Sequence, residues 1–359
     1  MSDTQIAWDI GTAYDLFVSL EVLYHPAEFD VRGVWAAGVR ARIPAQSRLV
    51  LEQSLLLFHV PLSWIIHLPG LKDSNSVLSE LRKLEPTGRL AALAFEPHFP
   101  PEYAHILKNV SELGRWDEED HETLSTVYRQ VSRQQEKKPP SYKDISLILD
   151  AWSHSAEFGE RYLQALTVYC DVFFSLEERR IQPILQKSLS AAQKRAEVLP
   201  LQDLLEELTQ GIRFEKMSAS EHAVLAPSYW STPLVYFSKS DAGRTIYLFG
   251  GRPADDPLMP GESVPDALLR VLKALSDSTR LQIIQYLSEH PHTPTELSRR
   301  LRLRVPTVLH HLKVLRLAGL VRLTLEETGL TRHYAARPEA VENAFSLLAR
   351  FFDSEKTPR

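Results

Sequence analysis

Basic side chains gather in one short window near the C-terminal end of this 359-residue chain. From Arg299 to Arg322 there are seven Lys and Arg residues and no Asp or Glu. Residues 264–359 hold 15 basic and 10 acidic side chains, whereas residues 1–263 hold 26 basic and 36 acidic ones. A phosphate backbone attracts such a patch, and an acidic remainder limits non-specific binding. The charges favour nucleic-acid binding at one end of the chain; the alternative is a solvated basic helix face.

The elements that position these charges follow from apolar spacing and from helix caps. Thr293, Pro294 and Glu296 form the pattern of a capping box with proline in the first helical turn. Gly319 marks the end of a later helix, where the backbone turns left-handed. We predict helices at 264–276, 279–287, 293–301 and 305–318, two wing strands at 321–325 and 331–335, and a last helix at 339–352.

The outer face of the predicted 305–318 helix carries the candidate contacts to duplex DNA. Val308, Leu312 and Leu315 share the inner face, so the opposite side enters the major groove in a helix-turn-helix. His311 lies nearer the inner face, and we expect it to be structural. We predict phosphate contacts from Arg304, Lys313, Arg316 and Arg322, base-edge contacts from Thr307 and His310, and phosphate or minor-groove contacts from Arg332 and His333 on the wing.

Three segments of this region resemble the ArsR-type winged-helix repressors. They read ALSDSTRLQII, ELSRRLRLRVPTVLHHLKVLRLAGLV and RHYAA, and the resemblance covers about 80 of the 359 residues. It implies a homodimer, built with the first and last helices of the domain, that binds a roughly palindromic operator in double-stranded DNA. Repression is the usual mode of action in that family.

The sequence departs from the family pattern at several functional positions. Pro306 and Leu309 stand where the family often has serine, and Arg304 replaces a serine at the helix start. Many relatives bind metals through a Cys-x-Cys pair on the helix that matches residues 295–301, or through His and Asp on the terminal helix. Both sets of ligands are missing here, and we expect the neighbouring histidines His290 and His292 to be solvated. The sequence therefore predicts a regulator without a metal site or cofactor.

Residues 1–250 are predicted to form a mostly helical domain that ends in a β-hairpin. Helical spacing occurs at 13–23, 45–58, 101–113, 121–133 and 201–208, and one buried stripe consists of Tyr162, Leu166, Tyr169 and Phe173. Pro183 should kink or end the helix that carries this stripe. The runs 234–238 and 244–249 predict the hairpin. We place a linker at 251–263 and a winged helix-turn-helix domain at 264–359, in a mainly α chain.

The long N-terminal region shows no catalytic motif, so we expect no enzyme and no catalytic residue. The aromatic residues Trp8, Tyr14, Phe17 and Tyr24 form either plain core or the lining of a ligand pocket. Asp9, Asp15 and Glu21 are scattered carboxylates of the first helix and its approach. A single cysteine, Cys170, rules out an intrachain disulfide and is predicted to be buried.

No apolar run is long enough for a membrane span and no signal peptide is visible, so we expect a cytoplasmic protein. The leading hypothesis is a DNA-binding transcription regulator whose N-terminal domain senses a small molecule, binds a protein effector or extends the dimer. Two alternatives stay open. One is an enzyme domain fused to a DNA-binding tail, and the other is a winged helix that binds protein.

Overall fold

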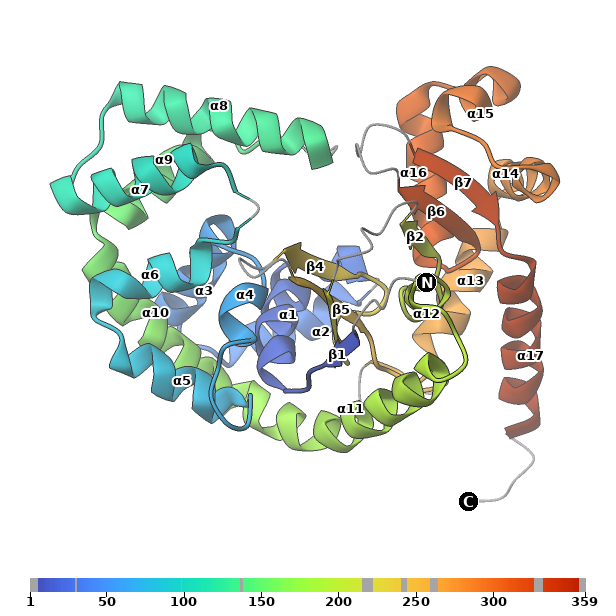
Figure 1. Cartoon of the computed structure of the whole chain (residues 1–359), viewed down its shortest axis with the longest axis horizontal. Coiled ribbons are helices and arrows are strands. Elements are labelled where there is room, and N and C mark those ends of the chain that lie inside the picture. The colour runs from blue at the N-terminus through green and yellow to red at the C-terminus, as the bar shows by residue number, and fades with distance from the viewer. Residues whose placement is uncertain are drawn as a thin grey trace.

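The computed structural model describes residues 6–29, 31–97, 99–135, 138–214, 222–239, 244–258, 264–325 and 332–354. The chain is mainly helical, as predicted, with a large N-terminal lobe (residues 6–258) and a C-terminal unit that we call the head (residues 264–354; Figure 1). None of the described helices combines the length and the apolar character that crossing a membrane requires.

Amphipathic helices build most of the N-terminal lobe around one large apolar core. The helices predicted at 13–23, 45–58, 101–113 and 121–133 are present as α1, α3, α7 and α8. In chain order the elements are α1 (Ala13–Tyr24), a 3-10 turn (Pro26–Phe29), α2 (Gly33–Ala41), α3 (Ala45–Leu57), α4 (Leu62–Ile65), α5 (Ser74–Lys83), α6 (Pro86–Ala94), α7 (Pro101–Leu113), α8 (Glu118–Gln135), α9 (Tyr142–Ser153) and α10 (Ser155–Tyr169).

Two consecutive helices lead from this core toward the head. The predicted stripe lies on α10 and on the π-helical turn Cys170–Phe174, and all four of its side chains are buried. The next helix, α11 (Ser175–Ala196), bows beneath the lobe in Figure 1 and is followed by α12 (Leu201–Leu208). Pro183 lies inside α11, so the prediction that it could end the helix is wrong. Pro183 and Arg179 are both exposed, so the carbonyl that lacks its amide partner can bond to water.

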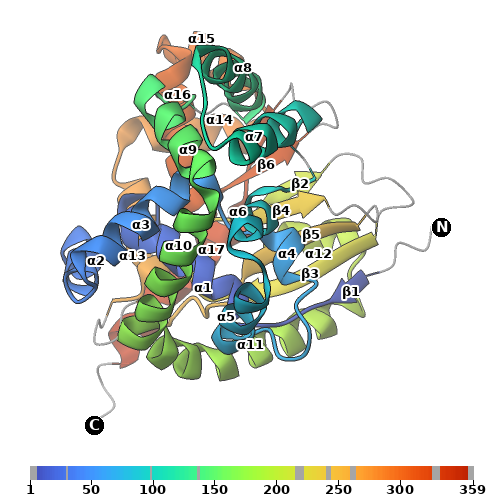
Figure 2. The ribbon, with the colours of Figure 1, turned by 90° about the vertical axis from the view of Figure 1, so that its left-hand side faces the viewer.

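A four-stranded sheet lies in the middle of the lobe, with α11 below it in Figures 1 and 2. Its order is β1-β3-β5-β4, in which β1, β3 and β5 are parallel and β4 is antiparallel to β5. The antiparallel pair confirms the predicted hairpin, whereas β1 and β3 were not expected in a mostly helical region. The strands are β1 (Ile6–Trp8), β3 (His222–Ser228), β4 (Tyr236–Lys239) and β5 (Arg244–Gly250).

Both faces of this sheet are buried, which explains why β3 shows no alternating pattern. Val224 and Ile246 belong to the large helical core, while Leu225 and Tyr247 face a second cluster. That second cluster contains Leu204 and Leu205 of α12, so α12 is packed onto the sheet of the N-terminal lobe.

The head has the predicted winged-helix elements and its own apolar core, centred on Val308, Leu312 and Leu315. Gly319 has a φ of +72°, as expected for a residue that ends a helix. The turn between the wing strands lies outside the described residues. The elements are α13 (Asp266–Leu275), α14 (Ser278–Glu289), α15 (Pro294–Leu301), α16 (Val305–Leu317), β6 (Val321–Leu325), β7 (Arg332–Ala336) and α17 (Pro338–Ser354).

A short strand of the preceding region completes the sheet of the head. This strand, β2 (Ile212–Phe214), pairs in parallel with β6, and the sheet order is β2-β6-β7. The amide of Leu323 donates to the carbonyl of Gly211 at 2.7 Å. The winged helix therefore contains a strand from before residue 251, in addition to residues 264–354.

A buried ion pair also connects the lobe to the head. We call the β2–β6 pairing and this ion pair the two joints. Arg252 follows β5, and its Nη1 donates to Oδ2 of Asp266, in the first turn of α13, at 2.5 Å. The amide of Leu258 donates to the same oxygen at 2.6 Å. The Arg252 guanidinium also lies 5.7 Å from the ring centre of Tyr229. The side chains of Arg252 and Asp266 are only 2% and 11% exposed, so each charge depends on the other for compensation.

We predict that Asp266→Asn lowers the free energy of unfolding by about 3–5 kcal/mol, because it leaves the Arg252 guanidinium buried without its counter-charge. Urea unfolding of the full chain measures this value. The matched control is Glu80→Gln, which breaks the solvent-exposed pair with Lys83 and should cost less than about 1 kcal/mol. Equal losses in the two variants would contradict the assignment of Arg252–Asp266 as a joint.

We also predict that Gly211→Ala destabilises the chain by about 2 kcal/mol, because Gly211 has a φ of +107° and lies against the head. An added Cβ would lie 2.9 Å from Cδ of Arg337 and 3.1 Å from the carbonyl oxygen of Val321. The control is Gly38→Ala within α2, where nothing lies within 4 Å of the new atom. That variant should be neutral or more stable, by up to about 1 kcal/mol. Thermal unfolding of both variants checks the expected order.

Candidate nucleic-acid interface

The predicted capping box sets the start of the helix that precedes the recognition helix. The amide of Glu296 donates to Oγ1 of Thr293 at 3.3 Å, and the amide of Thr293 donates to Oε2 of Glu296 at 2.7 Å. The helix ends at Arg302, whose φ of +55° turns the chain toward α16. The hydroxyl of Ser298 donates to the carbonyl of Leu303 at 2.6 Å and holds this turn. The angle between α15 and α16 is therefore fixed by local hydrogen bonds.

The recognition helix α16 presents four of the predicted contact residues on one exposed face. Arg304 precedes its first turn, and Thr307, His310 and Lys313 follow at intervals of three residues. All four are exposed, while Val308, Leu312 and Leu315 on the other side are fully buried. Residues three apart on a helix are neighbours, so these side chains form one continuous surface. We call these four residues the recognition face.

The three other predicted contact residues lie in different surroundings. Arg316 is partly buried beside Tyr334 and Arg332, and burial lowers the pKa of its guanidinium. Arg332 pairs with Leu325 across the wing, next to the pair of Leu323 and Tyr334. Because side chains alternate along a strand, Arg332 lies on the same face as the buried Tyr334. Arg322 lies on the opposite face with His333.

Arg322 forms an ion pair with the N-terminal lobe. Its Nε donates to Oε1 of Glu206 on α12, and the Glu206 carboxylate is 10% exposed. Oε2 of the same carboxylate accepts from Nη1 of Arg213 at 2.7 Å, and Arg213 also contacts Asp203 at 3.2 Å. Glu206 could not be found by sequence reasoning, because it is 116 residues from Arg322 and lies in an ordinary amphipathic helix.

Two histidines of the head, His292 and His311, have structural surroundings. His311 is partly buried, as expected, with Nδ1 4.0 Å from Oδ1 of Asp277, and burial lowers its pKa. His292 is 3% exposed, so the expectation that it is solvated is wrong. Its amide and carbonyl pair with those of Tyr334 at 2.9 Å, which adds a bridge to the edge of β7. Over the described residues, no three His, Cys, Asp or Glu side chains are grouped to hold a metal.

The aromatic and acidic residues of the first helix that the sequence analysis named contribute to the core and connect elements of the lobe. Tyr14 and Phe17 are buried in the large core, which favours the plain-core interpretation of the aromatic group. Oδ1 of Asp15 accepts from the hydroxyl of Ser228 at 2.6 Å and from the amide of Trp230 at 2.8 Å. Burial of Asp15 raises the pKa of its carboxyl to about 6. Asp15 thus ties the start of α1 to the end of β3.

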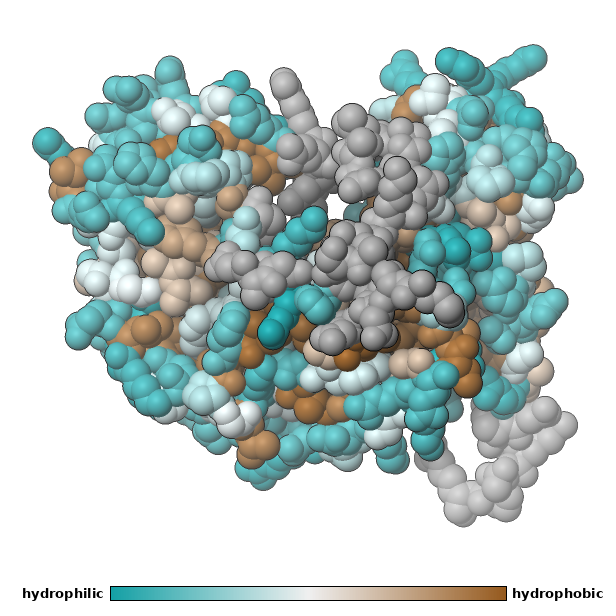
Figure 3. All heavy atoms as spheres, viewed as in Figure 1, coloured by the Kyte–Doolittle hydropathy of each residue, from teal (hydrophilic) through white to brown (hydrophobic). Residues whose placement is uncertain are grey.

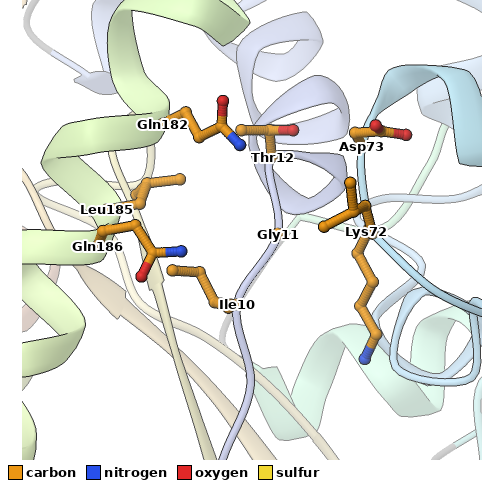
Figure 4. A pocket seen from close by; sticks show the side chains of 9 residues that line it. Ile10, Gly11, Thr12, Lys72, Asp73, Gln182, Leu185 and Gln186 are labelled. Atoms are coloured by element: carbon orange, nitrogen blue, oxygen red, sulfur yellow. The ribbon is translucent and has the colours of Figure 1, made fainter.

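A small hollow lies between the β1–α1 connection and α11, with a volume of about 60 Å³ (Figure 4). Lys72 at its edge already donates to Asp9 at 2.6 Å, and Asp73 caps α5 by accepting from the Ser76 amide. The side chains of Gln182 and Gln186 reach toward the hollow from α11 (Figure 4). Ligand pockets usually enclose several hundred cubic ångströms, so this hollow is too small to identify an effector site.

Comparison with known proteins places the head in a family. The family model described as bacterial regulatory protein, arsR family, matches residues 277–322. A solved structure of an ArsR family transcriptional regulator is 24% identical, covers 27% of this chain and 97% of its own, and has a TM-score of 0.23. No curated protein matches the chain. The matched segment, from the cap of α14 into β6, carries an arsR-family helix-turn-helix, which indicates a DNA-binding transcription regulator.

Proposed function

We propose that the protein is a sequence-specific DNA-binding repressor that does not sense a metal. The observation that carries this proposal is the recognition face, on which Arg304, Thr307, His310 and Lys313 are exposed together on α16. Thr307 and His310 offer hydrogen-bonding groups to base edges, and Arg304 and Lys313 supply positive charge for the flanking phosphates. In Figure 3 hydrophilic residues predominate on the visible surface of the head at the upper right, with a few hydrophobic residues among them.

Arg316, Arg322 and Arg332 are assigned a secondary part in this interface. Arg316 of α16 lies close to Arg332, the first residue of β7, and Arg322 is neutralised by Glu206. The charge of Arg316 and Arg332 adds to the positive potential of the region, which attracts the DNA backbone over a distance of about 10 Å. The four residues of the recognition face make the direct contacts.

The active form is proposed to be a homodimer that pairs through α13 and α17. Along α17, Val341 and Ala344 pack on the core of the head, whereas Phe345 and Phe352 are about 60% exposed. Leu272 of α13 is also exposed, and α13 packs against α17. Exposed aromatic side chains on one helix are expected where a second copy covers them.

The N-terminal lobe is proposed to be regulatory, with a small molecule or a protein as its effector. Both joints to the head come from this lobe, so a change in the lobe is transmitted to the wing and to α13. Because duplex DNA is the proposed partner, we place the protein in the cytoplasm with the chromosome.

We predict that Lys313→Ala and His310→Ala both weaken DNA binding, with different salt dependence. A duplex selected from a random pool, labelled with fluorescein, is titrated over a salt series and followed by anisotropy. Lys313→Ala should reduce the slope of log K against log salt by about 1, because one phosphate contact is lost. His310→Ala should leave the slope unchanged and reduce discrimination between the selected and a scrambled duplex, at a cost of about 1–3 kcal/mol.

The control for both variants is Lys187→Ala, which removes an exposed charge from α11, outside the head. It should bind as the natural protein does. If Lys313→Ala and His310→Ala also bind as the natural protein does, α16 is not the DNA-binding element and the proposed function fails.

We predict that Phe345→Glu converts the dimer to monomers, because it places a charge in the centre of the proposed interface. Sedimentation velocity at micromolar concentration measures the change. Leu113→Glu on α7 is the matched control, since Leu113 is equally exposed but lies in the N-terminal lobe. A natural protein that sediments as a monomer, or a Phe345→Glu variant that stays dimeric, would contradict pairing through α17.

A further inference from the structure

The outer face of the wing is in contact with a segment of the N-terminal lobe and is partly covered by it, since the Arg322 side chain is 36% exposed. Val321 and Leu323 of β6 point into the core of the head, so Arg322 between them points outward. On that outer side its guanidinium meets Glu206 of α12. Arg322, a positive side chain of the wing that the sequence predicts to contact DNA phosphate, is thus paired with a carboxylate of its own chain.

The Glu206 carboxylate is held in place by the strand that follows α12. The next elements after Glu206 are the turn at Gly211 and the strand β2, which pairs residue by residue with β6 from Ile212 opposite Leu323 to Phe214 opposite Leu325. Side-chain amide Nε2 of Gln202 donates to the carbonyl of Phe214 at 2.8 Å, which ties α12 to β2. The α12–β2 segment (residues 201–214) therefore docks on the wing as one unit.

The other side of the α12–β2 segment is attached to the N-terminal lobe. Leu204 and Leu205 pack against the central sheet, and the ring of Phe214 lies 6.0 Å from that of Phe237 and 5.4 Å from that of Tyr247. The segment thus contacts the wing with its strand edge and with Glu206, and contacts the lobe with its apolar side chains. A shift of the lobe moves both contacts together.

We propose that Glu206 is an autoinhibitory residue: it neutralises Arg322 while the α12–β2 segment is docked, and release of the segment frees this cation for a DNA phosphate. This inference rests on the proposed DNA-binding function and adds a regulatory step to it. The paired Arg322 and Glu206 carry no net charge together. They therefore do not neutralise a phosphate and release no counterions from the DNA. Because coupling is reciprocal, DNA that takes Arg322 also loosens residues 201–214.

The test compares four full-length proteins, namely the natural chain, Glu206→Gln, Arg322→Ala and the double variant. Each is titrated with the same labelled duplex over a salt series, with circular dichroism to check folding. Glu206→Gln should bind about 3–10-fold more tightly at low salt, with a slope steeper by about 0.9, the value for one phosphate contact. Arg322→Ala alone should change affinity less than about 2-fold, and in the Glu206→Gln background it should abolish the gain.

The control is Asp203→Asn, which also removes one negative charge from α12. Asp203 pairs with Arg213, whereas Glu206 pairs with both Arg213 and Arg322. A gain equal to that of Glu206→Gln would show a general charge effect and overturn the proposal. The proposal also fails if Arg322→Ala weakens the natural chain as much as it weakens Glu206→Gln. If none of the four proteins binds any duplex, the proposed function itself fails, and the inference with it.

Hydrogen exchange of the natural chain decides the case if Glu206→Gln does not fold. On addition of the duplex, peptides from residues 201–214 should exchange faster, while peptides from α16 become protected. Unchanged or slower exchange at 201–214, together with protection of α16, would overturn autoinhibition and leave the DNA-binding function intact.

Discussion

A buried charge must have a partner, and this constraint determines where the head is attached. The guanidinium of Arg252 follows strand β5 of the central sheet and is almost wholly removed from water. An unpaired charge in that position would cost several kcal/mol, so the chain has to bring a carboxylate to it. Asp266 supplies that carboxylate from the first turn of α13, where the helix dipole also favours negative charge. The first helix of the head is thereby fixed to the end of a lobe strand.

The other joint, between β2 and β6, satisfies a different requirement, the pairing of a strand edge. Strand β6 would have one free edge in an isolated wing, and such edges invite association with other chains. Strand β2 covers it, and Gly211 allows the backbone to come close enough. With one joint at α13 and one at the wing, the head cannot rotate on a single hinge. Motion of the head relative to the lobe therefore requires either that β2 separates from β6 or that α12 and β2 move together with the head.

Local signals in the sequence were sufficient for the head and insufficient for the joints. The Thr293–Glu296 capping box, the buried stripe of α16 and Gly319 are each encoded within a few residues, so the head could be predicted in detail. Strand β3 is buried on both faces and has no alternation, and β1 is only three residues long. The pairing of Glu206 with Arg322 joins residues far apart in the sequence, and no local pattern predicts it. Exposure of the recognition face could be predicted; the burial of Arg316 could not.

Pro306 and Leu309, where the ArsR-type pattern often has serine, give the proposed dimer and the Arg322–Glu206 pair a common role. In the proposed dimer, with Pro306 and Leu309 in α16, each head would read bases with Thr307 and His310, and each good contact discriminates by about 1–3 kcal/mol. One head would thus supply about 2–6 kcal/mol, and the sum of two heads spans the range of about 4–10 kcal/mol by which specific binding typically exceeds non-specific binding. Specificity also improves if the sequence-independent attraction falls, and neutralising Arg322 lowers that attraction while leaving the base contacts untouched. In this proposal, a head with few base contacts gains selectivity because the Glu206 carboxylate neutralises Arg322.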